Sequence, residues 1–210
     1  MIDPIVLLTF VPAALALNLT PGADMMFCLG QGMRSGARPA VAASAGISVG
    51  SLVHVVLAGL GLSAVVQTVP WLFDVIRWVG VGYLLYLASG AFRGAFGGAA
   101  VTAANGLGMA SLRAFRAGLF VNLTNPKVIL FVLAFIPQFV DPSRPVLAQF
   151  LVFGSVLGLG GFVINALVGI FAGGASRALA GSAAAQKWLG RVTGGIFVAL
   201  AARLAMIERA

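Results

Sequence analysis

Residues 18–24 read Asn18-Leu19-Thr20-Pro21-Gly22-Ala23-Asp24 and interrupt an apolar run that extends from Ile5 to Leu29. Proline removes a backbone hydrogen-bond donor and clashes with the preceding helical turn, and glycine adds conformational freedom. A helix is therefore expected to break at Pro21 and Gly22. The carboxylate of Asp24 follows this break inside the same apolar run.

A second stretch of this kind lies in the other half of the chain, inside the apolar run from Ala117 to Val140. It reads Asn122-Leu123-Thr124-Asn125-Pro126-Lys127. Its first three residues are identical to those of the first stretch, but it carries a base where the first stretch carries an acid. Two interrupted apolar segments in corresponding halves of a chain are the best sequence pointer to a transporter's binding site.

The composition is that of an all-α integral membrane protein. The 210 residues are 60% hydrophobic with a mean hydropathy of +1.07, and only 9% are charged, whereas a soluble domain carries about a quarter charged residues. The net charge of +8 does not indicate nucleic acid, because the basic residues stand singly at the ends of apolar runs. We expect them to anchor helices at the surface of a lipid bilayer.

Six segments are long and apolar enough to cross a bilayer, and they cover residues 4–30, 40–66, 70–92, 115–140, 146–173 and 187–207. The connections after the first, third and fifth segments, with their flanks, carry most of the basic residues: Arg34, Arg38, Arg93, Arg113, Arg116, Arg177, Lys187 and Arg191. Basic loops stay in the cytoplasm, so this pattern predicts that both termini lie outside it.

The two halves repeat beyond the opening motif. Gly46 and Gly50 align with Gly154 and Gly158, and residues 77–80 (Arg-Trp-Val-Gly) align with residues 187–190 (Lys-Trp-Leu-Gly). We therefore divide one transmembrane domain, 1–210, into repeat one (1–93), a linker (94–114) and repeat two (115–210). Three helices per repeat is an odd number, so the repeats should be inverted in the membrane, as in many transporters.

Asp24 and Lys127 are the charged candidates for the site. A carboxylate at membrane depth costs at least ~2.5 kcal/mol and usually has a function, such as trading a proton for a cationic or zwitterionic substrate. The alternative is a structural partner for the helix break or for Lys127. Lys127 could hold a substrate carboxylate, pair with Asp24, or simply extend its ammonium to the nearby interface.

Amide and hydroxyl groups surround both breaks, on Asn18, Thr20, Asn122, Thr124 and Asn125. They could satisfy the backbone groups that a broken helix releases, and this structural role would explain them by itself. The helix that restarts after each proline, Pro21 or Pro126, also presents free N–H groups that suit a carboxylate. An amino acid could then place its carboxylate at a break and its ammonium at Asp24.

Two further polar residues lie inside apolar spans. His54 continues the row of Gly46 and Gly50 at a spacing of four, where it either packs between helices or serves the site; Asn165 leaves the same two alternatives. One histidine, one cysteine and five acidic residues offer little for a metal site. No nucleophile with a base and no phosphate-binding loop occurs, so neither an enzyme nor a cofactor is expected.

These motifs, in this order, resemble the LysE/RhtB family of amino-acid exporters. The residues concerned are Thr20-Pro-Gly-Ala-Asp24, Gly32-x-Arg34-x-Gly36, Gly46-x-x-x-Gly50-x-x-x-His54, Gly80-x-x-Tyr83-Leu84, Asn125-Pro126-Lys127 and Pro137-Gln138-Phe139. The family usually has proline at the position of Ala23, which predicts a gentler first break here. The resemblance implies a bacterial inner-membrane protein of six helices that exports amino acids and related small metabolites in exchange for protons.

The sequence thus predicts a secondary exporter of amino acids or related small zwitterionic metabolites, driven by the proton-motive force through Asp24. The few acidic residues at depth favour a small neutral zwitterion over a dicationic one. Two alternatives are a non-transporting membrane scaffold or subunit and an exporter of metal or inorganic ions. Close packing by small residues would also allow a homodimer.

Overall fold

The computed structural model describes residues 2–68, 72–93, 109–172 and 182–206, and within these ranges the regular elements are all helical. The elements in chain order are α1 (Pro4–Leu19), α2 (Ala23–Ser35), α3 (Ala37–Thr68), α4 (Leu72–Arg93), α5 (Ser111–Leu123), α6 (Pro126–Ala134), the 3₁₀ helix η2 (Ile136–Phe139), α7 (Val146–Ile170) and α9 (Ala183–Ala205). The prediction of an all-helical chain is confirmed for these residues.

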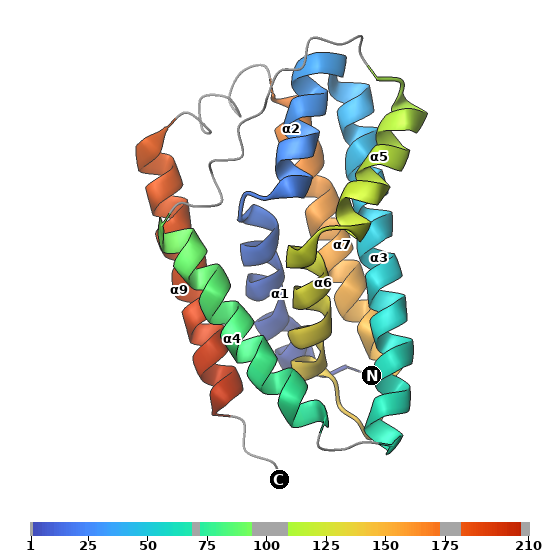
Figure 1. Cartoon of the computed structure of the whole chain (residues 1–210), viewed down its shortest axis with the longest axis vertical. Coiled ribbons are helices and arrows are strands. Elements are labelled where there is room, and N and C mark those ends of the chain that lie inside the picture. Colours follow the sequence, from blue (N-terminus) through green and yellow to red (C-terminus); the bar gives the residue numbers. More distant parts are fainter. Residues whose placement is uncertain (1, 69–71, 94–108, 173–181, 207–210) are drawn as a thin grey trace.

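The two polar motifs break helices, as the sequence predicts. Helix α1 ends before Pro21, and α2 continues at an angle of 53° to it; α5 and the segment Pro126–Phe139 enclose an angle of 55°. In Figure 1 both breaks lie near the middle of the long axis, next to each other. The two breaks are thus similar in angle.

Length and composition give two to four membrane-crossing units among the described residues. Helix α3, over Ala37–Leu62, and helix α7 can each cross a membrane alone, and each bent pair can form one further crossing. The start of α1 and the end of α9 lie at one end of the bundle, and the α2–α3 turn and the start of α5 lie at the other (Figure 1). The predicted six crossings are therefore not established by helix length alone.

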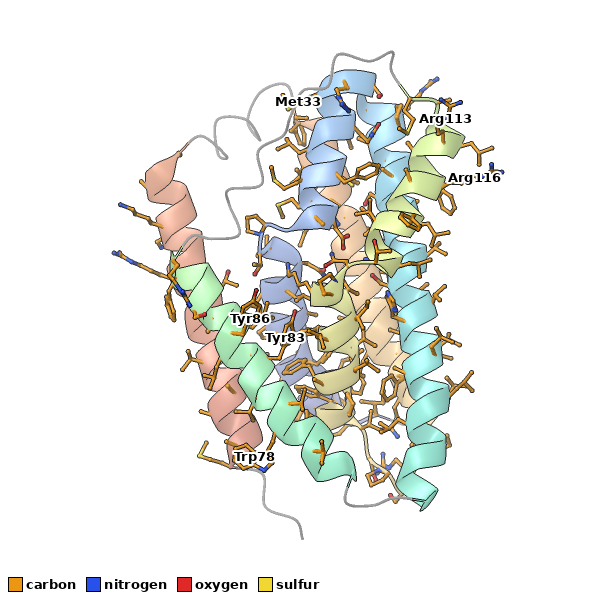
Figure 2. All side chains as sticks on the ribbon, viewed as in Figure 1. Met33, Trp78, Tyr83, Tyr86, Arg113 and Arg116 are labelled. Carbon is orange, nitrogen blue, oxygen red and sulfur yellow. The ribbon has the colours of Figure 1, made fainter. Side chains whose placement is uncertain are left out.

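Some predicted boundaries shift. Helix α5 begins at Ser111, so residues 111–114 belong to a helix and not to the linker. The sequence hid this turn because Arg113 breaks the apolar run, but its side chain lies at the outer surface beside Arg116 (Figure 2). Similarly, α3 starts at Ala37 rather than 40. Most of the linker, residues 94–108, and Arg177 lie outside the described residues.

Two apolar clusters hold the bundle together, one on each side of the breaks. Near the terminal end, the rings of Phe10, Phe135, Phe139 and Phe153 meet at centroid distances of 4.9–6.1 Å. Towards the other end a smaller cluster joins α2, α3 and α5; it consists of Cys28, Ala43, Ile47 and Ala114. In a lipid environment such contacts stabilise the bundle by close van der Waals packing.

Glycines bring backbones into contact at the end opposite the termini. A methyl group at Gly46 would overlap the carbonyl oxygen of Phe115, and one at Gly118 would overlap that of Ala43, so α3 and α5 touch through their main chains. Gly32 of α2 meets Gly169 of α7 in the same way. These contacts close the bundle tightly at this end.

Candidate functional site

The two helix breaks meet around one small cavity of about 20 Å³. Seven of the residues predicted for the site line it: Asn18, Thr20, Gly22, Asp24, Asn125, Lys127 and Asn165. Leu17, Met25 and Val128 complete the lining. A cavity of this size holds about one water molecule, so the polar groups of both halves face each other across almost no free space.

Lys127 closes the end of α1. Its Nζ donates hydrogen bonds to the carbonyl oxygens of Leu17, at 2.6 Å, and Thr20, at 2.7 Å. The last carbonyls of a helix have no partner within it and carry the negative end of the helix dipole. The lysine that follows the second break thus supplies the partner that the first break leaves missing. It neither reaches the interface nor forms an ion pair with Asp24.

Asp24 makes the reciprocal contact with the second break. Its Oδ2 accepts a hydrogen bond of 2.9 Å from Nδ2 of Asn122, near the end of α5. Its Oδ1 is buried, with the side chain of Asn125 nearby, and no donor meets it in hydrogen-bond geometry among the described residues. A buried carboxylate oxygen without a donor costs free energy, so this atom is an open acceptor for a proton or a cationic group.

Asn122 is the centre of the polar layer and is fully buried. Besides its bond to Asp24, its Oδ1 accepts from the hydroxyl of Ser51 at 3.4 Å, and its backbone oxygen lies 3.3 Å from Nε2 of His54. The side chain therefore connects α2, α3 and α5. Asn122 does not line the cavity itself; it positions the Asp24 carboxylate through this hydrogen bond.

The other polar residues of the motifs mainly satisfy backbone groups. Asn18 donates to the carbonyl of Leu157 on α7 at 3.1 Å. The hydroxyl of Thr20 bonds to Ala16 within its own helix, that of Thr124 bonds to Phe120, and the side chain of Asn125 accepts from the backbone N–H of Lys127. Thr124 is exposed, and neither it nor Pro21 nor Pro126 lines the cavity.

Two contributors to the site were missed in the sequence. Ser51 supports Asn122, and the hydroxyl of Tyr83 donates to the carbonyl of Lys127 at 3.1 Å, reaching from α4 towards α6 (Figure 2). Ser51 had a detectable signal, since Ser44, Ser48, Ser51 and His54 recur every three or four residues along one face of α3. The carbonyls of Leu17 and Thr20 had none, because every residue has a carbonyl.

His54 points to a second, larger cavity. This space of about 400 Å³ lies between α3, α6, η2 and α7. Apart from His54 its lining is apolar: Leu57, Ala58, Gly61, Leu62, Ile129, Val132, Leu133, Pro137 and Phe150. Through its contact with the Asn122 carbonyl, His54 lies at the boundary between the apolar cavity and the polar layer.

Within the described ranges, no three histidine, cysteine, aspartate or glutamate side chains group together in a way that could hold a metal ion. The polar layer contains one carboxylate, one ammonium and several amides and hydroxyls. Chemically, this set suits hydrogen bonding to a small molecule that carries both charges.

The sequence model of the LysE type translocator family matches residues 15–207. The chain belongs to this family. It is 37% identical over 138 residues, 66% of either chain, to a protein of Salmonella typhimurium named homoserine/homoserine lactone efflux protein. It is 32% identical over 202 residues, 95% of either chain, to the leucine efflux protein of Enterobacter sp..

A third relative of this LysE type translocator is named only an uncharacterized membrane protein, from Vibrio cholerae. It is 35% identical over 147 residues, which cover 70% of this chain and 71% of that one. No solved structure matches the chain. The family is one of translocators, and this LysE type translocator is accordingly a membrane transport protein.

Proposed function

We propose that this LysE type translocator is a secondary exporter of amino acids or related small zwitterionic metabolites across the bacterial inner membrane. The observation that carries the proposal is the meeting of two helix breaks, one with Asp24 and one with Lys127, around a single polar cavity. The relatives named as efflux proteins for homoserine, its lactone and leucine support amino acids as the substrate class.

We further propose six crossings arranged as two inverted repeats. Asn18 at the end of α1 contacts α7, while Asn122 at the end of α5 contacts α3. At the first break, the Leu17 carbonyl accepts a hydrogen bond from Lys127; at the second break, Asn122 donates one to Asp24. This reciprocal pattern, with bends of 53° and 55°, is what inversion of two equivalent halves would produce. The predicted division into repeats 1–93 and 115–210 then moves its second boundary to Ser111.

Proton antiport would depend on Asp24. Its buried Oδ1 has no donor, so the carboxylate can bind a proton or a substrate ammonium at the same oxygen, but not both. Competition of this kind couples the two movements, because each ligand leaves when the other arrives. The substrate carboxylate would then turn to Lys127.

The first prediction tests transport and coupling together in proteoliposomes under an imposed pH gradient. Wild type should export leucine or homoserine, and Asp24→Asn should be at least about tenfold slower, because removing one charge of a buried polar pair costs about 2–5 kcal/mol. Its residual transport should no longer respond to the gradient.

Asp141→Asn is the matched control. Asp141 lies in the exposed η2–α7 connection, where Ser143 and then Arg144 hold the pKa of its carboxyl below the usual value. It stays ionised throughout the assay, and its loss should leave transport unchanged. Gradient-dependent export by Asp24→Asn at the wild-type rate would contradict the coupling role. No export by folded wild type would favour a scaffold or an ion exporter.

A further inference from the structure

We propose that the ammonium of Lys127 is an internal ligand that occupies the binding site of the substrate ammonium until substrate displaces it. This inference rests on the proposed amino-acid export and concerns what the site binds when it is empty of substrate. Lys127, which follows the second helix break, donates to the free carbonyls at the first break. Asp24, which lines the same cavity, has a carboxylate oxygen without a donor.

The chemical match is close. A lysine side chain ends in a primary ammonium with three donors, the same group that an amino acid carries at its α-carbon. Lys127 donates two hydrogen bonds, to the carbonyl oxygens of Leu17 and Thr20, at 2.6 and 2.7 Å. These lengths are in the short range of charge-assisted hydrogen bonds. The end of α1 is therefore formed to accept a primary ammonium.

A further acceptor lines the same cavity. Leu17, Thr20 and Asp24 all line the cavity of about 20 Å³, and Oδ1 of Asp24 lacks a donor. A substrate ammonium on the two carbonyls would thus share a cavity with an unpaired carboxylate oxygen. The smallest amino acid has five non-hydrogen atoms, so it cannot enter a space for about one water while Lys127 stays in place.

Displacement also accounts for the charge balance. A buried charge without a partner is costly, and the cavity holds one acid and one base. When a zwitterion enters, its ammonium replaces that of Lys127 on the carbonyls, and the released Lys127 takes the substrate carboxylate. With Asp24 ionised before and after the exchange, the total charge stays constant. A dicationic amino acid would add one unpaired positive charge, so the exchange selects neutral zwitterions with a primary ammonium.

Chemical rescue of Lys127→Ala tests the site directly. The substitution removes three methylenes and the ammonium, which together correspond to n-propylammonium. We would follow thermal unfolding of the detergent-solubilised protein by labelling the thiol of Cys28, which is buried and reacts when the fold opens. The variant should melt about 5–10 °C below wild type, and millimolar n-propylammonium should restore at least about half of this loss.

Three controls make the result specific. Tetramethylammonium has the same charge without N–H donors and should not rescue Lys127→Ala. Wild type, whose site is occupied, should not respond to n-propylammonium. Lys187→Ala removes the chain's other lysine, which is exposed on α9, and should behave as wild type. Absence of rescue, or equal effects of both cations, would overturn the internal ligand.

A second measurement uses the wild-type chain in case Lys127→Ala does not fold. With isotope-labelled lysine the protein should give two side-chain signals, since the sequence has two lysines. Leucine should shift the Lys127 signal and N-acetyl-leucine, which has no ammonium, should not. A protein that exports leucine without this shift would refute displacement and keep the exporter. A shift without export would refute the exporter and keep the ammonium site.

Discussion

Asn122 shows how one side chain can determine the geometry of the site. It is fully buried, and it joins Asp24 on α2 to Ser51 and His54 on α3. Asn18, its counterpart in the repeat, bonds to a backbone carbonyl of α7 instead. The two asparagines are equivalent in sequence, but only Asn122 touches a charged group.

This difference gives a prediction at the scale of residues. Asn122→Leu should lower the free energy of unfolding by about 1–3 kcal/mol, because Asp24 loses its donor. Combined with Asp24→Asn, the two effects should be non-additive by at least about 0.5 kcal/mol. The measurement is a double-mutant cycle of unfolding in mixed micelles.

Asn18→Leu is the matched control for that cycle. It removes the same side chain from the other break, and because Asn18 bonds to the Leu157 carbonyl and not to Asp24, its coupling to Asp24→Asn should be smaller than that of Asn122→Leu. Additivity of the Asn122 pair would show that the 2.9 Å contact contributes no coupling.

At the scale of helices, glycines with the same spacing in sequence have different surroundings. Gly46 and Gly158 both belong to Gly-x-x-x-Gly rows on helices that we align between the repeats. A methyl group at Gly46 would overlap the backbone of α5, whereas one at Gly158 would lie 3.8–3.9 Å from its neighbours, an ordinary packing distance. Only the first glycine is required by a close approach.

Gly46→Ala should therefore destabilise the protein by about 1–3 kcal/mol through overpacking. Gly158→Ala should be neutral or stabilising by up to about 1 kcal/mol, because alanine is the better helix former. Comparing the two variants in thermal unfolding tests the prediction. Equal losses would mean that the α3–α5 contact is no tighter than the environment of Gly158.

At the scale of the whole molecule, the two ends of the bundle differ in charge and in packing. The end with the α2–α3 turn and the start of α5 carries Arg34, Arg38, Arg113 and Arg116 and is closed by backbone contacts. The opposite end, where α1 starts and α9 ends (Figure 1), contains the phenylalanine cluster and the 400 Å³ cavity. We propose that the basic end faces the cytoplasm.

Single cysteines test this orientation in whole cells, in a Cys28→Ala background. Ser143→Cys lies in the exposed connection at the terminal end and should react with a membrane-impermeant maleimide added outside. Ala110→Cys, exposed at the start of α5, should react only after the membrane is permeabilised. The opposite labelling pattern would invert the proposed topology.

Helix breaks, membrane character and the family could be predicted from the sequence, because each depends on local chemistry. Proline with glycine or asparagine disrupts the helix wherever it occurs, and 60% hydrophobic residues suit only a lipid environment. These features need no knowledge of which segment lies beside which.

The contacts of the site depended on the tertiary structure. Lys127 and Asp24 have opposite charges, and the sequence left open that they pair; the fold instead gives each a partner at the end of the other half's broken helix. Two of these partners are backbone carbonyls, which every residue has whatever its side chain, so the sequence does not mark them. The sequence determined that each half has a break and a charge, and only the packing of the halves decided what each charge contacts.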